Sequence, residues 1–190
     1  MKMRATFFKK LVVAVLLLTS PCAAHAAHGA SPLKVVEEIK VDAPLEKVWG
    51  VIDDFAHPIT TLTIERIEAS GNNTPDQAQR RLFLKDGVMI EEVLTKRDGE
   101  RFMIGVHRKT DNLQLLPAVN YTSLITLRSL DQDHTIIEWK ARFYRGYPNN
   151  NPPPELNDDV AVAAVKKLIT GELAALKKHI ERDWRSSGLL

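Results

Sequence analysis

Cysteine is almost absent from this chain, because Cys22 is the only one among 190 residues. It lies in an N-terminal segment that joins four basic residues, the apolar run 11–18 and an A-x-A sequence ending at Ala26. A charged region, a short hydrophobic region and such a site predict a secretory signal peptide, residues 1–26, that is cleaved. The mature chain would then contain no thiol, which excludes disulfides, thiol catalysis and cysteine metal sites.

A long hydrophobic run and a true surplus of basic residues are missing as well. The apolar run 11–18 is too short to span a bilayer, so the mature chain is predicted to have no transmembrane segment. Removing residues 1–26 takes away four of 26 Lys and Arg residues and no acid, which leaves 22 against 24 and a formal charge of −2. Basic clusters with interleaved aromatics are also lacking. The composition therefore argues against nucleic-acid binding, and export predicts a periplasmic location.

Motifs of metal binding and nucleophilic catalysis are not found. The histidines are scattered, with no pair at i, i+4 and no H-E-x-x-H sequence. A G-x-S-x-G elbow and a glycine-rich phosphate loop are also lacking. The acidic pairs Asp53-Asp54 and Asp158-Asp159 are explained by helix ends. We therefore expect no metal, no cofactor and no catalytic residue, and a binding protein is favoured over an enzyme.

The sequence does contain regular strand and helix patterns, and residues 27–190 are predicted to form a single domain. Alternating polarity predicts a strand over 34–41, and apolar residues at helical spacing predict a short helix after Pro44. Six further strand-like runs follow, separated by turn sequences such as SGNNTPD and RDG. They cover residues 62–69, 79–86, 88–97, 100–109, 119–130 and 134–145.

The last element, from about Pro154, has an apolar residue every three or four positions between Val162 and Trp184, which predicts a long helix. Gly171 in its middle suggests close packing there. Hairpin-length connections favour an antiparallel sheet, and one long helix has to cover one face of it. The predicted class is α+β: a seven-stranded antiparallel sheet wrapped on a long C-terminal helix. Because a single helix rarely fills the space over a curved sheet, we expect an internal cavity.

Strand parity predicts which side chains face that cavity. Buried charges need partners, so Glu37 and Arg108 on inward parity could meet inside. Alternatively Arg108 lies past the rim in water and Glu37 faces an uncovered patch, which the rarity of buried Arg and Glu favours. His57 lies where such a fold opens, although His-Pro is also a common helix terminator. The expected lining is Glu37, His57, Phe102, Arg108, Tyr121, Trp139 and Phe143.

The sequence YRGYPNNNPPPELNDD joins the last strand to the long helix. Three prolines stiffen it, and Gly146 and the three asparagines permit turns, which is all that a connector needs. Tyrosine and arginine, however, are the residues that anchor interfaces, and rigidity lowers the entropy lost on binding. The loop is equally a connector or a partner-binding surface. Its candidate residues are Tyr144, Arg145, Tyr147, Asn149, Asn150, Glu155 and Asn157.

The element order and the stretch IKVDAPLEKVWGVIDDF resemble the SRPBCC superfamily of START-related, Bet v 1-like proteins, often labelled polyketide cyclase/dehydrase. Residues 116–165, with LPAVNYTSLITL and IIEWKARFYRGYPNNNPPPELNDD, resemble more specifically the exported MxaD-type proteins of bacterial methanol-oxidation clusters. The resemblance covers the mature chain and implies a helix-grip fold. It also implies a periplasmic accessory role that supports electron transfer between a quinoprotein alcohol (methanol) dehydrogenase and cytochrome c. Relatives usually have an aromatic residue before His-Pro, where this chain has Ala56, so the loop at the cavity mouth is expected to be shortened.

Two alternatives remain open. The first is a carrier of a lipid or another hydrophobic small molecule in the internal cavity, although an ordinary packed core explains the same residues. The second is a cyclase- or hydrolase-like enzyme that uses His57 with Glu37 or Arg108. The second alternative requires these side chains to converge on one pocket.

Overall fold

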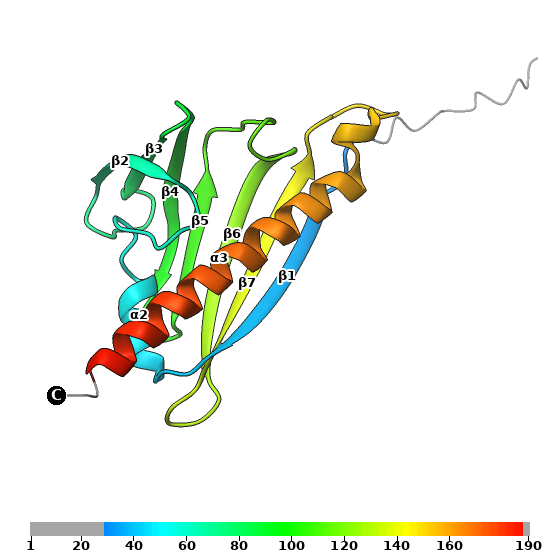
Figure 1. Cartoon of the computed structure of the whole chain (residues 1–190). Helices are drawn as coiled ribbons and strands as arrows, with labels where there is room; N and C mark the ends of the chain where they lie inside the picture. The colour runs from blue at the N-terminus through cyan, green and yellow to red at the C-terminus, as the bar shows by residue number, and fades with distance from the viewer. Residues whose placement is uncertain (1–28, 188–190) are drawn as a thin grey trace, which may run out of the picture.

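The computed structural model describes residues 29–187, so the predicted signal peptide over residues 1–26 lies outside it. A curved antiparallel sheet wraps around one long helix, as Figure 1 shows. The strands are β1 (Leu33–Val41), β2 (Ile64–Ser70), β3 (Gln79–Leu84), β4 (Met89–Asp98), β5 (Met103–Arg108), β6 (Ala118–Ser129) and β7 (Thr135–Arg145). The helical elements are α2 (Leu45–Ile52), the 3-10 turn η1 (Pro154–Leu156) and α3 (Asp158–Ser187).

The strand order is β1-β7-β6-β5-β4-β3-β2, and every neighbouring pair is antiparallel. From β2 to β7 each strand pairs with the next along the chain, as the short turn sequences predict. The first strand, β1, instead pairs with the last, β7. The predicted fold class, with seven strands, a short helix and a long C-terminal helix in the helix-grip arrangement, is confirmed.

The long helix begins later than predicted, at Asp158 rather than near Pro154. Residues Pro154–Leu156 form a separate 3-10 turn. Asn157 then caps α3, because its Oδ1 accepts the backbone N–H of Val160 at 2.9 Å. The prolines stiffen the approach, and Asn157 sets the helix start.

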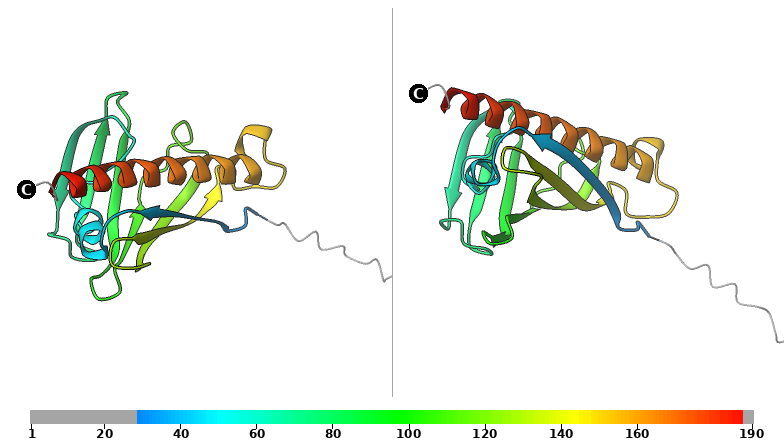
Figure 2. Two further views of the ribbon diagram at one scale, coloured as in Figure 1. Left: turned by 60° about the horizontal axis from the view of Figure 1, so that its bottom comes forward. Right: turned by 90° about the horizontal axis from the view of Figure 1, so that it is seen from below.

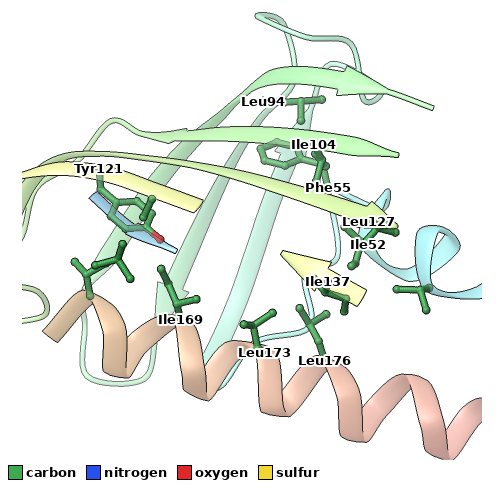
Figure 3. Packing of buried hydrophobic residues seen from close by; sticks show 14 of the residues in the cluster. Ile52, Phe55, Leu94, Ile104, Tyr121, Leu127, Ile137, Ile169, Leu173 and Leu176 are labelled. Atoms are coloured by element: carbon green, nitrogen blue, oxygen red, sulfur yellow. The ribbon is translucent and has the colours of Figure 1, made fainter. Parts of the chain in front are cut away.

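The main core lies between α3 and the concave face of the sheet. Figure 2 shows α3 crossing this face, and Figure 3 shows the side chains of Ile169, Leu173 and Leu176 directed toward the strands. These three side chains are buried, as are Leu127 and Ile137 opposite them. Burying a Leu or Ile side chain contributes about 1.5–3 kcal/mol, so this stripe fixes the helix on the sheet.

A second, smaller apolar cluster lies under β3 and β4 and consists of Leu82, Leu84 and Ile90. It does not merge with the main core under α3. Polar side chains such as Arg80 and Glu92 lie between the two clusters.

Candidate ligand-binding site

An internal cavity of about 90 Å³ lies between α3, the loop around Pro58–Leu62 and the concave face of strands β3 to β7. We call it the inner cavity. Its apolar walls include Leu82 from the smaller cluster and Val106, Ile125 and Leu168 from the main core. Its other lining residues carry polar or charged groups: Arg80, Glu92, Arg108, Tyr121, Ser123, Trp139, Thr60 and Glu172.

Three of these charged residues form one row across the sheet. Glu92 on β4 stands in register with Arg80 on β3 and with Arg108 on β5. Arg80 Nε donates a hydrogen bond to Glu92 Oε2 at 2.8 Å, and Arg80 Nη2 lies 2.6 Å from the same oxygen. Its Nη1 donates to the carbonyl oxygen of Phe55 at 2.6 Å. Arg80 is therefore fully engaged by the protein.

The charge of Glu92 is maintained in spite of its burial. Its side chain is 8% exposed, and burial alone would raise the pKa of its carboxyl group. The guanidinium groups of Arg80 and Arg108 outweigh that effect and hold the pKa of Glu92 below its ordinary value. Glu92 is consequently a carboxylate that two arginines share.

The cavity also contains three donors without acceptors among the described residues. Arg108 Nε lies 3.5 Å from Glu92 Oε1 but makes no aligned hydrogen bond. The indole of Trp139 lies beside the Tyr121 phenol, but neither Tyr121 Oη nor Trp139 Nε1 makes a hydrogen bond of regular geometry with any described residue. The Arg108 guanidinium carbon is 5.2 Å from the Tyr121 ring centroid. Figure 3 shows Tyr121 reaching from β6 toward α3. A buried donor without an acceptor costs about 1–3 kcal/mol, so such a group calls for an explanation.

Tyr121 is held in its protonated form. Tyr121 is 4% exposed, and burial raises the pKa of its phenol well above the ordinary value, while Arg108 and the neighbouring indole of Trp139 oppose this only in part. A protonated phenol can donate a hydrogen bond. Arg108, Tyr121 and Trp139 thus offer N–H and O–H groups to the same interior space.

Glu172 fastens the loop that forms the cavity wall next to α3. Its carboxylate accepts hydrogen bonds from Thr60 Oγ1 at 3.1 Å and from the Thr61 backbone N–H at 3.1 and 3.2 Å. The Thr61 hydroxyl donates to it as well. Glu172 is 5% exposed, so this buried acid ties the loop to the middle of the helix.

A larger groove of about 530 Å³ lies beside the inner cavity at the surface, and we call it the outer groove. It shares Leu62, Arg108 and Leu168 with the inner cavity, so Arg108 lies at their junction. The remaining residues of its walls are mostly apolar: Thr61, Leu115, Leu116, Ala164, Lys167 and Gly171. A Cβ atom added at Gly171 would have Thr61 Cγ2, at 3.8 Å, as its one neighbour within 4 Å. Close packing at Gly171 was therefore a wrong expectation, since the glycine lines a groove.

Three of the predicted cavity residues, Arg108, Tyr121 and Trp139, line the inner cavity. Arg108 has a side chain that is 11% exposed, which corrects the expectation that it lies in solvent beyond the rim. Phe143 is 1% exposed and belongs to the packed core. Phe102 lies in the turn before β5 at a φ of 51° and packs edge-to-face on Trp49 at 5.7 Å. Neither phenylalanine lines the inner cavity or the outer groove.

The pairing of Glu37 with Arg108, one of the two alternatives left open by the sequence, does not occur. Glu37 lies 3.3 Å from Lys166 Nζ on α3, while Arg108 contacts Glu92. His57 has a side chain that is 78% exposed and pairs with Asp54 at 3.0 Å. The structure thus keeps His57, Glu37 and Arg108 out of one pocket, because the loop turns His57 outward and β1 carries Glu37 beside the helix. The convergence that the enzyme alternative requires is not found.

The loop from Tyr144 to Asn157, here the rim loop, is organised around Arg145. This side chain is 9% exposed and donates to the carbonyl oxygens of Tyr147 and Asn149, both at 2.8 Å, and to Asp158 Oδ1 at 3.0 Å. Arg145 therefore faces inward and holds the loop together. The other candidate residues divide by exposure: Tyr144, Tyr147 and Asn157 are half-buried, while Asn149, Asn150 and Glu155 are exposed.

Sequence reasoning missed Arg80, Glu92 and Glu172. The signal was present in each case, because a charged residue interrupts an apolar face. Arg80 shares the parity of Leu82 and Leu84, and Glu92 lies between the buried Ile90 and Leu94. Glu172 similarly falls on the buried stripe of α3, next to Leu173.

Among residues 29–187, no group of three or more His, Cys, Asp or Glu side chains has an arrangement that could hold a metal ion. Across the same described range, no helix combines the length and the apolar character required to cross a bilayer.

The comparisons with known proteins agree with this architecture. Residues 32–181 match the model of a family described as polyketide cyclase/dehydrase and lipid transport. Among solved structures, the Zhui aromatase/cyclase from Streptomyces sp. R1128 is 19% identical with a TM-score of 0.63, covering 83% of this chain and 99% of that one. A comparison with curated proteins finds no match.

Two further structures show the same fold. Norcoclaurine synthase from Thalictrum flavum, in complex with dopamine and hydroxybenzaldehyde, is 14% identical with a TM-score of 0.62, covering 83% of this chain and 88% of the other. The protein XoxI from Bacillus cereus is 19% identical with a TM-score of 0.61, covering 77% and 94%. At these identities the likeness demonstrates the fold alone.

Proposed function

The chain belongs to the polyketide cyclase/dehydrase and lipid transport family, and on this premise we propose that it binds a small, largely apolar molecule between α3 and the sheet. The observation that carries the proposal is that the outer groove and the inner cavity adjoin each other and share Leu62, Arg108 and Leu168 in their walls. Small-molecule sites typically combine apolar walls with a few convergent polar groups. The groove supplies the walls, and Arg108, Tyr121 and Trp139 supply the polar groups.

The dimensions support binding across both spaces. Typical ligand pockets measure roughly 300–1,000 Å³. The inner cavity, at about 90 Å³, holds only a small chemical group. The outer groove, at about 530 Å³, has room for an apolar body. A ligand would therefore place its body in the groove and its polar end at the inner donors.

Solvent extraction of the purified protein, followed by mass spectrometry, tests this function. We expect a stoichiometric apolar molecule in the extract. Ser123 lines the inner cavity, so Ser123→Phe should fill it and abolish the bound molecule. Thr126→Phe makes the same kind of change on the opposite parity of β6 and should retain it. An extract without a ligand, from a protein that also binds no added apolar compound, would refute the proposal.

A second candidate is the accessory role in the periplasm, in which the exported protein supports electron transfer from a quinoprotein alcohol dehydrogenase to cytochrome c. The observation that favours it is the rigid rim loop, whose backbone Arg145 fixes and whose tip exposes Asn149, Asn150 and Glu155. A preorganised loop loses little entropy when a partner binds. The resemblance over residues 116–165 is the other support.

This candidate is tested with the dehydrogenase and cytochrome c purified from the same periplasm. The rate of cytochrome c reduction should rise when the protein is added. A variant with alanine at Asn149, Asn150 and Glu155 should lose the increase, since Arg145 remains to hold the loop. An unchanged rate with the native protein would remove the candidate.

The N-terminus of the periplasmic protein should be Ala27, which tests the predicted cleavage.

A further inference from the structure

The unpaired donors of the inner cavity come from three neighbouring strands and meet at one place. Arg108 ends β5, Tyr121 lies on β6 and Trp139 lies on β7, and all three line the inner cavity. Arg108 alone of the three also lines the outer groove. An acceptor group entering from the groove would therefore meet Arg108 first and the two aromatic donors behind it.

The charges around this path leave a surplus of one positive charge. In the inner cavity Arg80 and Arg108 balance Glu92 and Glu172, and the exposed Lys167 on the outer groove adds one positive charge. Both acids are occupied: Arg80 binds one oxygen of Glu92, and Thr60 and Thr61 bind Glu172. Among residues 29–187, Glu92 is the one acid that forms an ion pair with Arg108, at 3.5 Å. The Arg108 guanidinium can thus donate hydrogen bonds to a second negatively charged group.

We infer that the ligand is an apolar monocarboxylic acid, whose carboxylate is bound by Arg108 with Tyr121 and Trp139 while its hydrocarbon body occupies the outer groove. This inference rests on the proposed binding function and adds the chemical class of the ligand. The planar guanidinium matches the two oxygens of a carboxylate. A carboxylate also provides acceptors for the phenol and the indole, so the buried donors become satisfied.

Calorimetric titration with a matched pair of probes tests the inference. The probes are 6-phenylhexanoate and 6-phenylhexanamide, which have the same shape but differ in charge at the polar end. Near neutral pH, we expect the carboxylate to bind at least about tenfold more tightly than the amide, because charge-assisted hydrogen bonds are the stronger ones.

Variants locate the effect. Arg108→Gln should remove the preference for the carboxylate, and Tyr121→Phe should weaken carboxylate binding severalfold. Arg101→Gln is the matched control, since the side chain of Arg101 is 76% exposed. The comparison of the two probes on the native protein needs no variant, so a variant that fails to fold leaves the test intact.

The outcomes separate the inference from the proposed function. If both probes bind equally and Arg108→Gln changes neither, the carboxylate inference is overturned and the binding function stands. If neither probe binds and solvent extraction yields no molecule, the binding function fails and the inference fails with it. A preference for the carboxylate that Arg108→Gln abolishes supports both.

Discussion

Glu92 and Arg108 stand directly opposite each other on β4 and β5, yet their charged groups approach only to 3.5 Å without an aligned hydrogen bond. The other oxygen of Glu92 is held more closely by Arg80, at 2.6 and 2.8 Å. One buried carboxylate therefore serves two guanidinium groups unequally. The guanidinium of Arg108 therefore has N–H groups left to bind an anionic group at the junction of the inner cavity and the outer groove.

Glu92→Gln should destabilise the fold by about 3 kcal/mol near neutral pH, because it leaves two buried arginines without a charged partner. The folded-state pKa of Glu92 is lowered, so its stabilisation is present above the unfolded value, about 4.3, and is lost as the pH falls through the folded value. Urea unfolding should therefore show a deficit at pH 7 that shrinks below about pH 4.

The matched control for that experiment is Glu65→Gln, since Glu65 is exposed. A deficit for Glu92→Gln that persists unchanged into acid would contradict the role of its charge.

Gly171→Leu should stabilise the protein and weaken ligand binding at the same time. Leucine is better than glycine in a helix interior by about 1 kcal/mol. The new side chain has open space at its base, with Thr61 Cγ2 at 3.8 Å as the nearest contact, and would extend into the outer groove. Gly171→Ala gains similar helix stability with little bulk and should bind normally. Equal affinity of the two variants for 6-phenylhexanoate would show that the groove is not the binding path.

Glu172→Gln should loosen the loop around Thr60 and Thr61. The amide retains one acceptor oxygen where the carboxylate now accepts from both threonine hydroxyls and the Thr61 N–H. Hydrogen exchange of the Thr61 amide should accelerate, and ligand association should become faster because this loop walls the inner cavity. Unaltered exchange at Thr61 would mean that other contacts hold the loop.

Arg145→Ala should cost about 2–3 kcal/mol in the free energy of unfolding, since it removes charge-assisted hydrogen bonds that hold the rim loop. The two carbonyl oxygens of Tyr147 and Asn149 lose their donor, and Asp158 loses its partner. Arg142→Ala, an exposed change on the same strand, serves as the control in urea unfolding. Similar stability of the two variants would show that the hydrogen bonds of Arg145 do not stabilise the rim loop.

Most of the fold could be predicted because its signals are local. Period-two and helical patterns located each strand and α3, and parity on β6 and β7 placed Tyr121 and Trp139 on the inner face. The later start of α3 depends on the cap that Asn157 makes, which periodicity does not reveal.

The site could be predicted only in part, because charge pairing depends on register between strands. Nothing local links Arg80, Glu92 and Arg108, which lie on three strands. The sequence therefore indicated no partner for Arg108, and a position in solvent was favoured. His57 failed for a different reason. Its side chain pairs locally with Asp54 and is 78% exposed, so it does not line the cavity as expected.

The most direct test of the central claim is the indole N–H resonance of Trp139 in a nitrogen–proton correlation spectrum during titration with 6-phenylhexanoate. The chain contains three tryptophans. Trp49 packs on Phe102 and Trp184 lies near Lys47, so both are internal controls outside the inner cavity and the outer groove. Binding at the inner donors predicts a saturable shift of the Trp139 indole resonance, assigned with Trp139→Phe, and little change in the other two. A spectrum in which Trp139 stays fixed at saturating probe would contradict the account.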